Sequence, residues 1–397
     1  MIADIDREME ARNIDSLIVF GDSTVGNPDL GYVVGASLPR GGIYLKRKSQ
    51  PPTLVVSNID IGSARQGRVK NIRKYSDYGF ERLRAKYSAD DARSRFYQKL
   101  AKETGLSGKV VVAGRNDLAN SLFLIDSLRK KGLRIVGERT PTILESARET
   151  KDSLEANRLK GIAVKTDRVV EKTIQGLRNA RVTGAKVILK SQMLKVGTVR
   201  GIINHFLADE KLIAPEDTIV APGRKSSDPH YRGEDTDYIH AREPIVYDIF
   251  PCEPDGYWHD CTRTFCFGNP SRRLREMYEA VSEAQADAFD MVREEVPGKA
   301  LMLRTCELFE KRSYDTPRTV KGGMKGFIHG LGHGVGLTIG ERPYLNLYNN
   351  DPLRKGSVVT IEPGLYDPRI GGVRIEDTVL VGSPSKRLTN VEKFLEL

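Results

Sequence analysis

Five residues of types that bind metal ions lie in the second half of this 397-residue chain, each within or beside a short apolar segment typical of a β-strand. A carboxylate in such a strand is costly to bury unless it is paired, hydrogen-bonded or bound to a cation. The repetition of that cost in one part of the chain indicates a bound cation on which several strands converge. The five residues are Asp248, Asp260, His333, Glu362 and Glu376.

The chemistry of this set predicts the kind of ion that it binds. Four carboxylates and one imidazole favour Mn, Co, Zn or Fe(II) in an oxygen-rich site. Five ligands are too many for one zinc ion with an open position, but they fit two ions that share bridging carboxylates. The sequence therefore predicts a centre of two divalent metal ions. Their identity stays open, because availability decides among these metals.

The length of the chain predicts two domains, since one hydrophobic core rarely extends over so many residues. In residues 1–146, short β-rich runs such as SLIVF at 16–20 alternate with helical patterns such as 117–132. This alternation is typical of an α/β domain with a mixed sheet. A long, charged, helix-periodic segment begins at residue 147. We therefore expect an N-terminal α/β domain over residues 1–146 and a second domain over residues 147–397.

In the second domain, helical and extended segments follow one another in blocks, which predicts the α+β class. Long helices would cover one face of a curved antiparallel sheet. Within the first helical segment, apolar residues are expected to share one broad face; they are Leu154, Ile162, Val164, Val169 and Ile174. Further helices are expected over residues 184–195, 197–212, 270–296 and 299–312.

The composition excludes several classes of protein. Hydrophobic residues make up 39% and charged residues 29% of the chain, as in soluble globular proteins. No apolar stretch approaches the roughly 20 residues of a membrane span, and the acidic N-terminus lacks the pattern of a signal peptide, so a cytoplasmic location is expected. The net charge is +10, but Lys and Arg are interleaved with Asp and Glu, so we expect a solvated basic surface and no nucleic-acid partner.

Four segments together resemble the M24-type peptidase family that includes aminopeptidase P, prolidase, methionine aminopeptidase and creatinase. They occur in the family's order, and the resemblance covers most of residues 150–397. It implies a pita-bread catalytic domain after a smaller creatinase-like N-terminal domain. The segments are DCTRTF at 260–265, HGLGHGVGL at 329–337, TIEPGLY at 360–366 and GVRIED at 372–377.

The resemblance also implies a role for each metal ligand. Asp248 would hold one ion, His333 and Glu362 the other, and Asp260 and Glu376 would bridge the two. A hydroxide shared by both ions would be the nucleophile, with Glu362 as general base.

Three residues outside the ligand set are further candidates. His230 and His329 match histidines that hydrogen-bond the substrate or the tetrahedral intermediate in the family. The alternatives are a loop histidine for His230 and a packed, hydrogen-bonded imidazole for His329. Arg374 is expected to orient the ligand carboxylates, as arginines beside metal ligands often do, and contact with substrate is its alternative role.

The chain departs from the family pattern at three places. Asp248 and Asp260 lie twelve residues apart, one more than usual, and a turn at 252–256 is expected to absorb the extra residue. Gly340 stands where the family has a third pocket histidine, so one donor to the transition state, worth about 2.7–4 kcal/mol, is expected to be missing. Tyr344 stands where many prolidases have an arginine that grips the dipeptide carboxylate, and Arg342 lies two positions earlier.

These departures favour one function and leave others open. The resemblance implies a metal-dependent Xaa-Pro peptidase similar to aminopeptidase P, acting on peptides with proline in second position. The alternatives are an Xaa-Pro dipeptidase, and a metal-dependent hydrolase or lyase of a small non-peptide molecule. A binding module ranks last, because all five ligands are present. In such families the N-terminal domain often packs against a neighbour's catalytic domain, so a homodimer is expected.

Overall fold

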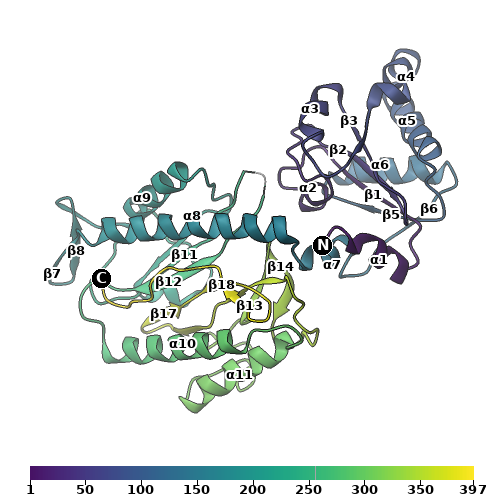
Figure 1. The fold of residues 1–397 in the computed structure, drawn as a ribbon. Helices are drawn as coiled ribbons and strands as arrows, with labels where there is room; N and C mark the ends of the chain where they lie inside the picture. The colour runs from purple at the N-terminus through teal and green to yellow at the C-terminus, as the bar shows by residue number, and fades with distance from the viewer. Residues whose placement is uncertain (255) are drawn as a thin grey trace. The chain divides into compact units, whose positions relative to one another are not determined.

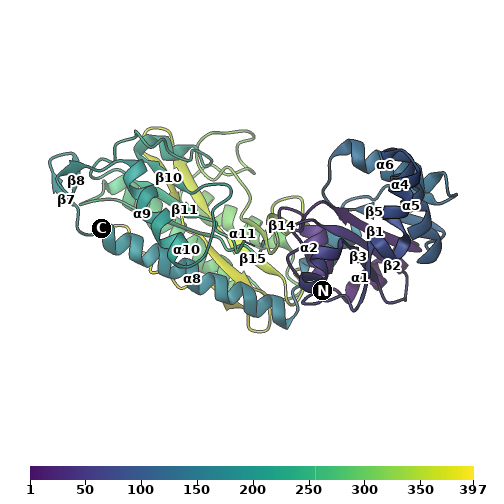
Figure 2. The same cartoon turned by 90° about the horizontal axis from the view of Figure 1, so that it is seen from above.

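The computed structural model describes residues 1–254 and 256–397, and it divides into two compact units, Met1–Arg148 and Glu149–Leu397 (Figures 1 and 2). The expected domain limit at residue 147 lies close to this division. That each unit is a domain able to fold alone stays a prediction.

The N-terminal unit is built on a six-stranded mixed sheet with the strand order β4-β3-β2-β1-β5-β6. Strand β1 is antiparallel to β2 and parallel to β5. The strands are β1 (Ser16–Gly21), β2 (Gly42–Arg47), β3 (Thr53–Val56), β4 (Asn71–Lys74), β5 (Lys109–Ala113) and β6 (Arg134–Val136). The helices are α1 (Asp4–Ala11), α2 (Pro28–Val34), α3 (Ile61–Ala64), α4 (Phe80–Lys86), α5 (Ala89–Glu103), α6 (Leu118–Arg129) and α7 (Ile143–Glu149).

Local sequence explains these elements. In β1, Ile18 and Phe20 project to the same face, into a core that also contains Val55 and Phe96. Helix α6 begins where the sequence indicates, because the Asp117 carboxylate accepts a hydrogen bond from the Asn120 N–H. The expected α/β character of this unit is confirmed.

The C-terminal unit contains three antiparallel groups of strands that position the candidate site. The first has the order β10-β11-β12, the second β14-β13-β15-β18-β19, and the third is the pair β16-β17. The strands are β10 (Ile219–Pro222), β11 (Ile245–Ile249), β12 (Cys261–Phe265), β13 (Gly332–Val335), β14 (Ile339–Leu345), β15 (Val358–Ile361), β16 (Gly364–Asp367), β17 (Gly371–Arg374), β18 (Asp377–Leu380) and β19 (Lys386–Arg387).

Long helices flank these strands. Figure 1 shows the strands lying between α8 (Ser153–Leu177) and α10 (Arg272–Met291). Helix α11 (Gly298–Lys311) packs with α10 on a core that includes Val359, Ile361 and Val373, while α9 (Val196–Asp209) packs against α8. The predicted α+β class is therefore confirmed. Among the described residues, no helix is both long enough and apolar enough to cross a membrane.

The expected helix over residues 184–195 is wrong. This segment lies in a small antiparallel sheet of β7 (Arg181–Thr183), β8 (Lys186–Leu189) and β9 (Gln192–Met193). Lys190 and Ser191 have φ values of 48° and 65°, so they form the two-residue hairpin turn between β8 and β9. Val187 and Leu189 are buried on one face of the strand. The spacing of the apolar residues in this segment is that of a strand and not of a helix.

The expected apolar face of α8 is only partly correct. Ile162, Val169 and Ile174 are buried, whereas Leu154 is 75% and Val164 47% exposed. Val164 follows Ile162 by two residues, which places it on the opposite side of the helix. The buried face of α8 instead includes Leu159 and, one turn further along the helix, Ala163.

Candidate metal centre

Two neighbouring strands carry the first two predicted ligands. Asp248 lies in β11 opposite Thr262 of β12, and Asp260 directly precedes β12. The chain between them turns where expected, with the Gly256 N–H donating to the Glu253 carbonyl at 2.9 Å. Asp255, within the predicted turn, lies outside the described residues. The Glu376 N–H donates to the Thr262 carbonyl at 3.0 Å, so the last ligand in the sequence also lies beside β12.

The remaining ligands come from the five-stranded sheet. His333 lies in β13, Glu362 follows β15, and Glu376 precedes β18. Strands β15 and β18 are paired, with Ile361 opposite Asp377, so Glu362 and Glu376 lie at the same end of the pair. The Glu362 N–H donates to the Leu331 carbonyl at 2.9 Å, which joins this end to the segment that carries His333.

Side chains of four of the five predicted ligands lie close together in space. One ligand atom each from Asp260, His333 and Glu376 lies within 4.8 Å of the other two. Nε2 of His333 is 3.6 Å from Oδ2 of Asp260 and 3.6 Å from Oε1 of Glu362. Within residues 1–254 and 256–397, this is the one group of at least three metal-binding side chains with ligand atoms so close together.

Several carboxylate oxygens in this group lack a protein partner. Oδ1 of Asp248, Oδ1 of Asp260 and Oε1 of Glu376 are buried and receive no hydrogen bond from the described residues. Their other oxygens are partly satisfied; for example, Oε2 of Glu376 accepts from the Thr262 hydroxyl at 2.6 Å. Buried, unpartnered anionic oxygens have a large desolvation cost that bound cations would offset. The residues present therefore fit a divalent metal centre.

The electrostatics of the group lead to the same conclusion. Burial, followed by the negative charges of neighbouring carboxylates, raises the pKa of Asp260 and of Glu376 well above the usual range. Burial also raises the pKa of Glu362 to about 7, with the Arg374 charge opposing the shift and Asp248 adding to it. Without a cation, this cluster takes up protons; with one, the carboxylates become ligands.

The orientation of His333 suits binding through Nε2. Its Nδ1 lies 3.1 Å from the Gly334 carbonyl and 3.2 Å from the Gly340 N–H, so the tautomer decides which of these it binds. Metal binding through Nε2 requires the proton on Nδ1, where the Gly334 carbonyl accepts it. Histidines that bind metals commonly use such a second hydrogen bond to fix the ring.

Arg374 connects the ligands to the predicted pocket residues. Its guanidinium is buried and donates to Oδ2 of Asp248 at 2.7 Å and to the Tyr366 hydroxyl at 2.9 Å. The Tyr366 hydroxyl lies 3.0 Å from Nε2 of His329, and Nδ1 of His329 lies 2.7 Å from the Gly330 carbonyl. Arg374 therefore contacts the carboxylate of Asp248, a predicted ligand, and both of its expected roles, orienting a ligand and contacting substrate, stay predictions.

This chain of hydrogen bonds sets the state of His329. Burial, together with the positive charge of Arg374, lowers the pKa of His329 to about 3, so the imidazole is neutral at neutral pH. Burial raises the pKa of Tyr366, which keeps its hydroxyl protonated and able to donate to His329. Tyr366 is not among the site residues predicted from the sequence. The sequence feature that could have identified it is a tyrosine four residues after Glu362, within the extended segment that follows that residue.

His230 lies on an exposed loop beside this network. The carbonyl of Pro229 accepts a hydrogen bond from Arg374 at 3.4 Å, and the His230 charge contributes to lowering the pKa of His329. The side chain of His230 is solvent-exposed, which leaves it accessible to a bound molecule. Its expected contact with substrate stays a prediction.

Arg342 and Tyr344, at the third departure from the family pattern, both have partners within the protein. Nη2 of Arg342 is 2.5 Å from Asp351, and its Nε is 3.5 Å from Glu149. The Tyr344 hydroxyl donates to the Gly340 carbonyl at 3.0 Å. Two carboxylates therefore already neutralise the Arg342 guanidinium.

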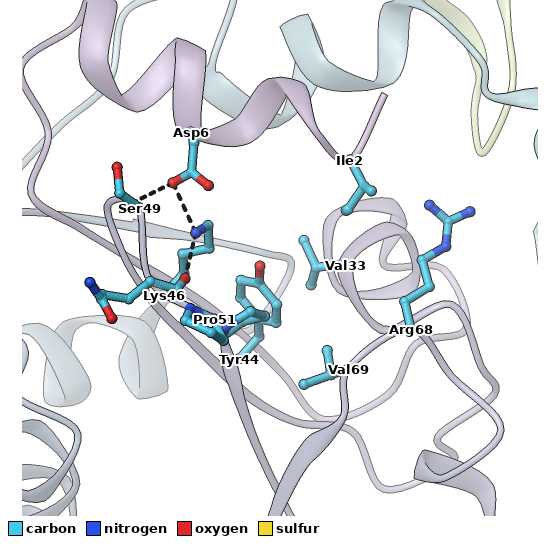
Figure 3. Close-up of a pocket in the computed structure, with 11 residues that line it drawn as sticks. Ile2, Asp6, Val33, Tyr44, Lys46, Ser49, Pro51, Arg68 and Val69 are labelled. Carbon is cyan, nitrogen blue, oxygen red and sulfur yellow. Dashed lines mark hydrogen bonds and ion pairs between the residues drawn. The ribbon is translucent and has the colours of Figure 1, made fainter.

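A pocket in the N-terminal unit does not offer comparable chemistry. It has a volume of about 430 Å³ and is drawn in Figure 3. Its carboxylate, Asp6, is 2.9 Å from Nζ of Lys46 and accepts a hydrogen bond from the Ser49 N–H at 2.8 Å. The anionic group of this pocket is thus satisfied by the protein itself, unlike the unpartnered oxygens of Asp248, Asp260 and Glu376.

Comparison with known proteins identifies relatives over the whole chain. An Xaa-Pro dipeptidase of Pyrococcus horikoshii is 28% identical over 391 residues, which cover 98% of this chain and 96% of that protein. An Xaa-Pro dipeptidase of Pyrococcus furiosus is 40% identical over 180 residues, 45% of this chain and about half (49%) of that protein.

The fold agrees with that of a solved relative. The crystal structure of the prolidase from Pyrococcus horikoshii OT3 matches with a TM-score of 0.75 and 26% identity, covering 99% of both chains. The predicted pita-bread architecture is confirmed by this match. The sequence profile of metallopeptidase family M24 matches residues 162–383, a segment that contains all five candidate ligands. The chain belongs to metallopeptidase family M24.

Proposed function

We propose that this protein is a dinuclear metal-dependent Xaa-Pro peptidase that hydrolyses the bond between an N-terminal residue and a following proline. One observation carries the proposal: Asp260, His333, Glu362 and Glu376, from four separate segments, lie close together, and buried carboxylate oxygens among them receive no hydrogen bond from the described residues. The relatives named Xaa-Pro dipeptidase support the choice of substrate class.

The five residues divide between two ions. Asp248 would hold one ion, His333 and Glu362 the other, and Asp260 and Glu376 would contribute to both. Bound Mn, Co, Zn or Fe(II) would acidify a water molecule and polarise the scissile carbonyl. The unpartnered oxygens belong to Asp248 and to the two residues assigned to bridging, which supports this division.

The other side chains would hold and orient the substrate. Glu362 is the most exposed carboxylate of the set, with 17% of its side chain accessible, and it would accept a proton from the attacking water. His230, on its exposed loop, would contact the substrate, and neutral His329 would keep the Tyr366 hydroxyl oriented toward the site. Arg374 would hold the carboxylate of Asp248 in place through its 2.7 Å hydrogen bond.

Within this class, we favour an aminopeptidase acting on longer peptides. A dipeptidase needs a cation for the free carboxylate of its substrate, and a bidentate arginine clamp depends on geometry. Arg342 is neutralised by Asp351 and Glu149. The alternative, an Xaa-Pro dipeptidase, is favoured by the names of the relatives.

The test is to load the purified protein with Mn or Co and to compare Xaa-Pro dipeptides with Xaa-Pro-Xaa tripeptides, using Xaa-Ala peptides as controls. We expect the tripeptides to have a kcat/KM at least about tenfold higher, equivalent to about 1.4 kcal/mol. A preference for dipeptides would establish the alternative. If no Xaa-Pro peptide is cut, the proposal fails and a small non-peptide substrate becomes the better hypothesis.

Removing the hydroxyl of Tyr366 is expected to slow the proposed reaction without releasing the metal. Tyr366→Phe deletes the acceptor for Arg374 and the donor to His329. A hydrogen bond to a charged group contributes about 1.5–3 kcal/mol, so kcat should fall roughly tenfold to a hundredfold. Steady-state kinetics and metal analysis check this. An unchanged kcat would show that the network has no role in the rate.

A further inference from the structure

We propose that the buried ion pair of Lys151 and Glu341 is a positioning device for the metal ligand His333. The inference rests on the proposed metal centre. It assigns a role to two residues outside the predicted ligand set. Both residues belong to the unit Glu149–Leu397.

The pair is closely held. Nζ of Lys151 is 2.8 Å from Oε1 of Glu341, and the two side chains are only 2% and 6% exposed. Lys151 also donates to the Glu149 carbonyl at 3.2 Å, and Oε2 of Glu341 accepts from the Thr338 hydroxyl at 3.2 Å. A buried ion pair with such additional hydrogen bonds holds its partners in one arrangement, because each charge left alone would be strongly disfavoured.

Gly336, directly after β13, leaves space for the carboxylate of this pair. A Cβ atom at Gly336 would lie 2.2 Å from Oε1 of Glu341, so any side chain at this position would displace the carboxylate. The Gly336 carbonyl accepts a hydrogen bond from the Trp258 N–H at 2.8 Å, two residues before Asp260. The ion pair therefore occupies a space that the end of β13 leaves open, next to the segment that carries a second ligand.

Glu341 connects the ion pair to His333 through the pairing of β14 with β13. In the β13–β14 pairing, Glu341 lies opposite Gly334, the residue directly after His333, and the register shifts on both sides of this pair. Such irregular pairing leaves the local backbone less determined by the sheet itself. Gly334, which pairs with Glu341, also has its carbonyl 3.1 Å from Nδ1 of His333, where it accepts the imidazole proton in the tautomer that binds metal through Nε2.

Lys151 fixes the other end of the device. Its own N–H donates to the Gly356 carbonyl at 2.8 Å, just before β15 begins at Val358. Strand β15 pairs with β13 through Val359 and Gly334. The ion pair thus links Lys151, at the start of the C-terminal unit, to β14 and to the segment before β15. Strands β14 and β15 are the two neighbours of β13, which carries His333.

Residues that orient a ligand without binding the metal typically change metal affinity or activity by about 10–100-fold when replaced. The test is calorimetric titration of the metal-free protein with MnCl2, combined with kcat and KM on an Xaa-Pro tripeptide. The double variant Lys151→Met/Glu341→Leu removes both charges together, so no unpaired charge remains. We expect it to fold and to bind Mn at least about tenfold more weakly, whereas Lys151→Arg keeps near wild-type affinity.

Two further variants make the test decisive if the double variant does not fold. Gly336→Ala keeps both charges but fills the space of the Glu341 carboxylate, and the same loss of Mn affinity is expected. Lys165→Met, the control, removes a partly exposed ion pair between Lys165 of α8 and Glu253 and should leave Mn affinity unchanged. Wild-type Mn affinity in both the double variant and Gly336→Ala would overturn the positioning role. Failure of the wild-type protein itself to bind Mn or Co would instead overturn the proposed metal centre.

Discussion

Glu376→Gln is expected to abolish peptide hydrolysis and, at the same time, to stabilise the metal-free protein near neutral pH. Glu376 is 2% exposed, and its Oε1 has no donor among the described residues. A neutral amide cannot contribute a charge to two ions, so we expect activity to fall by on the order of a thousandfold, or about 4 kcal/mol. The substitution also removes one of several mutually repelling carboxylates from the metal-free site, which raises the free energy of unfolding of the metal-free protein.

These opposite effects distinguish a metal ligand from a structural residue. They are measured as kcat/KM with excess Mn and as the midpoint of thermal unfolding in a chelator. Asp167→Asn is the matched control, because burial raises the pKa of Asp167 to about 6 and its side chain accepts from the Asn390 N–H outside the metal centre. We expect this control to keep its activity. Glu376→Gln with normal activity, or with a less stable metal-free form, would contradict the assignment.

The stability of the metal-free protein is expected to fall as the pH rises from about 5 to about 8, and divalent metal should remove most of this loss. The pKa of Glu362 is raised from 4.5 to about 7 in the folded chain. A carboxyl group with a raised folded pKa contributes stability that is present below its unfolded pKa and is lost as the pH passes its folded pKa. The loss from this group is of the order of a few kcal/mol.

Unfolding curves at several pH values, with chelator and with Mn, measure this linkage. Because the metal binds ionised carboxylates, its stabilising effect should grow with pH. Glu362→Gln should flatten the pH dependence of the metal-free protein. A metal-free protein that becomes more stable between about pH 5 and pH 8 would show that these carboxylates are paired in some other way.

The candidate site could be predicted from the sequence because its chemistry conflicts with its local environment. Asp248 within an apolar strand and Glu376 directly before another make sense only if both meet a positive charge. Helix boundaries with strong caps were also predictable: Ser271 accepts from the Leu274 N–H at the start of α10.

Other features could not be predicted because they depend on contacts or backbone conformations that arise only in the folded chain. Lys151 and Glu341 are separated by 190 residues, and the sequence around each one predicts a solvent-exposed charged side chain. The β8–β9 hairpin depends on two residues, Lys190 and Ser191, that adopt positive φ without being glycine. The contact of Arg342 with Asp351 became visible only in the folded chain.

The wide separation of the ligands along the chain has a consequence for the life of the protein in a cell. Even the closest two, Asp248 and Asp260, are twelve residues apart, and the set extends to Glu376. An unfolded chain therefore has no local chelating motif, and ions would be captured only after the strands have assembled. Metal occupancy would then report correct folding, and a shortage of ions would lower the stability of the folded chain as well as its activity.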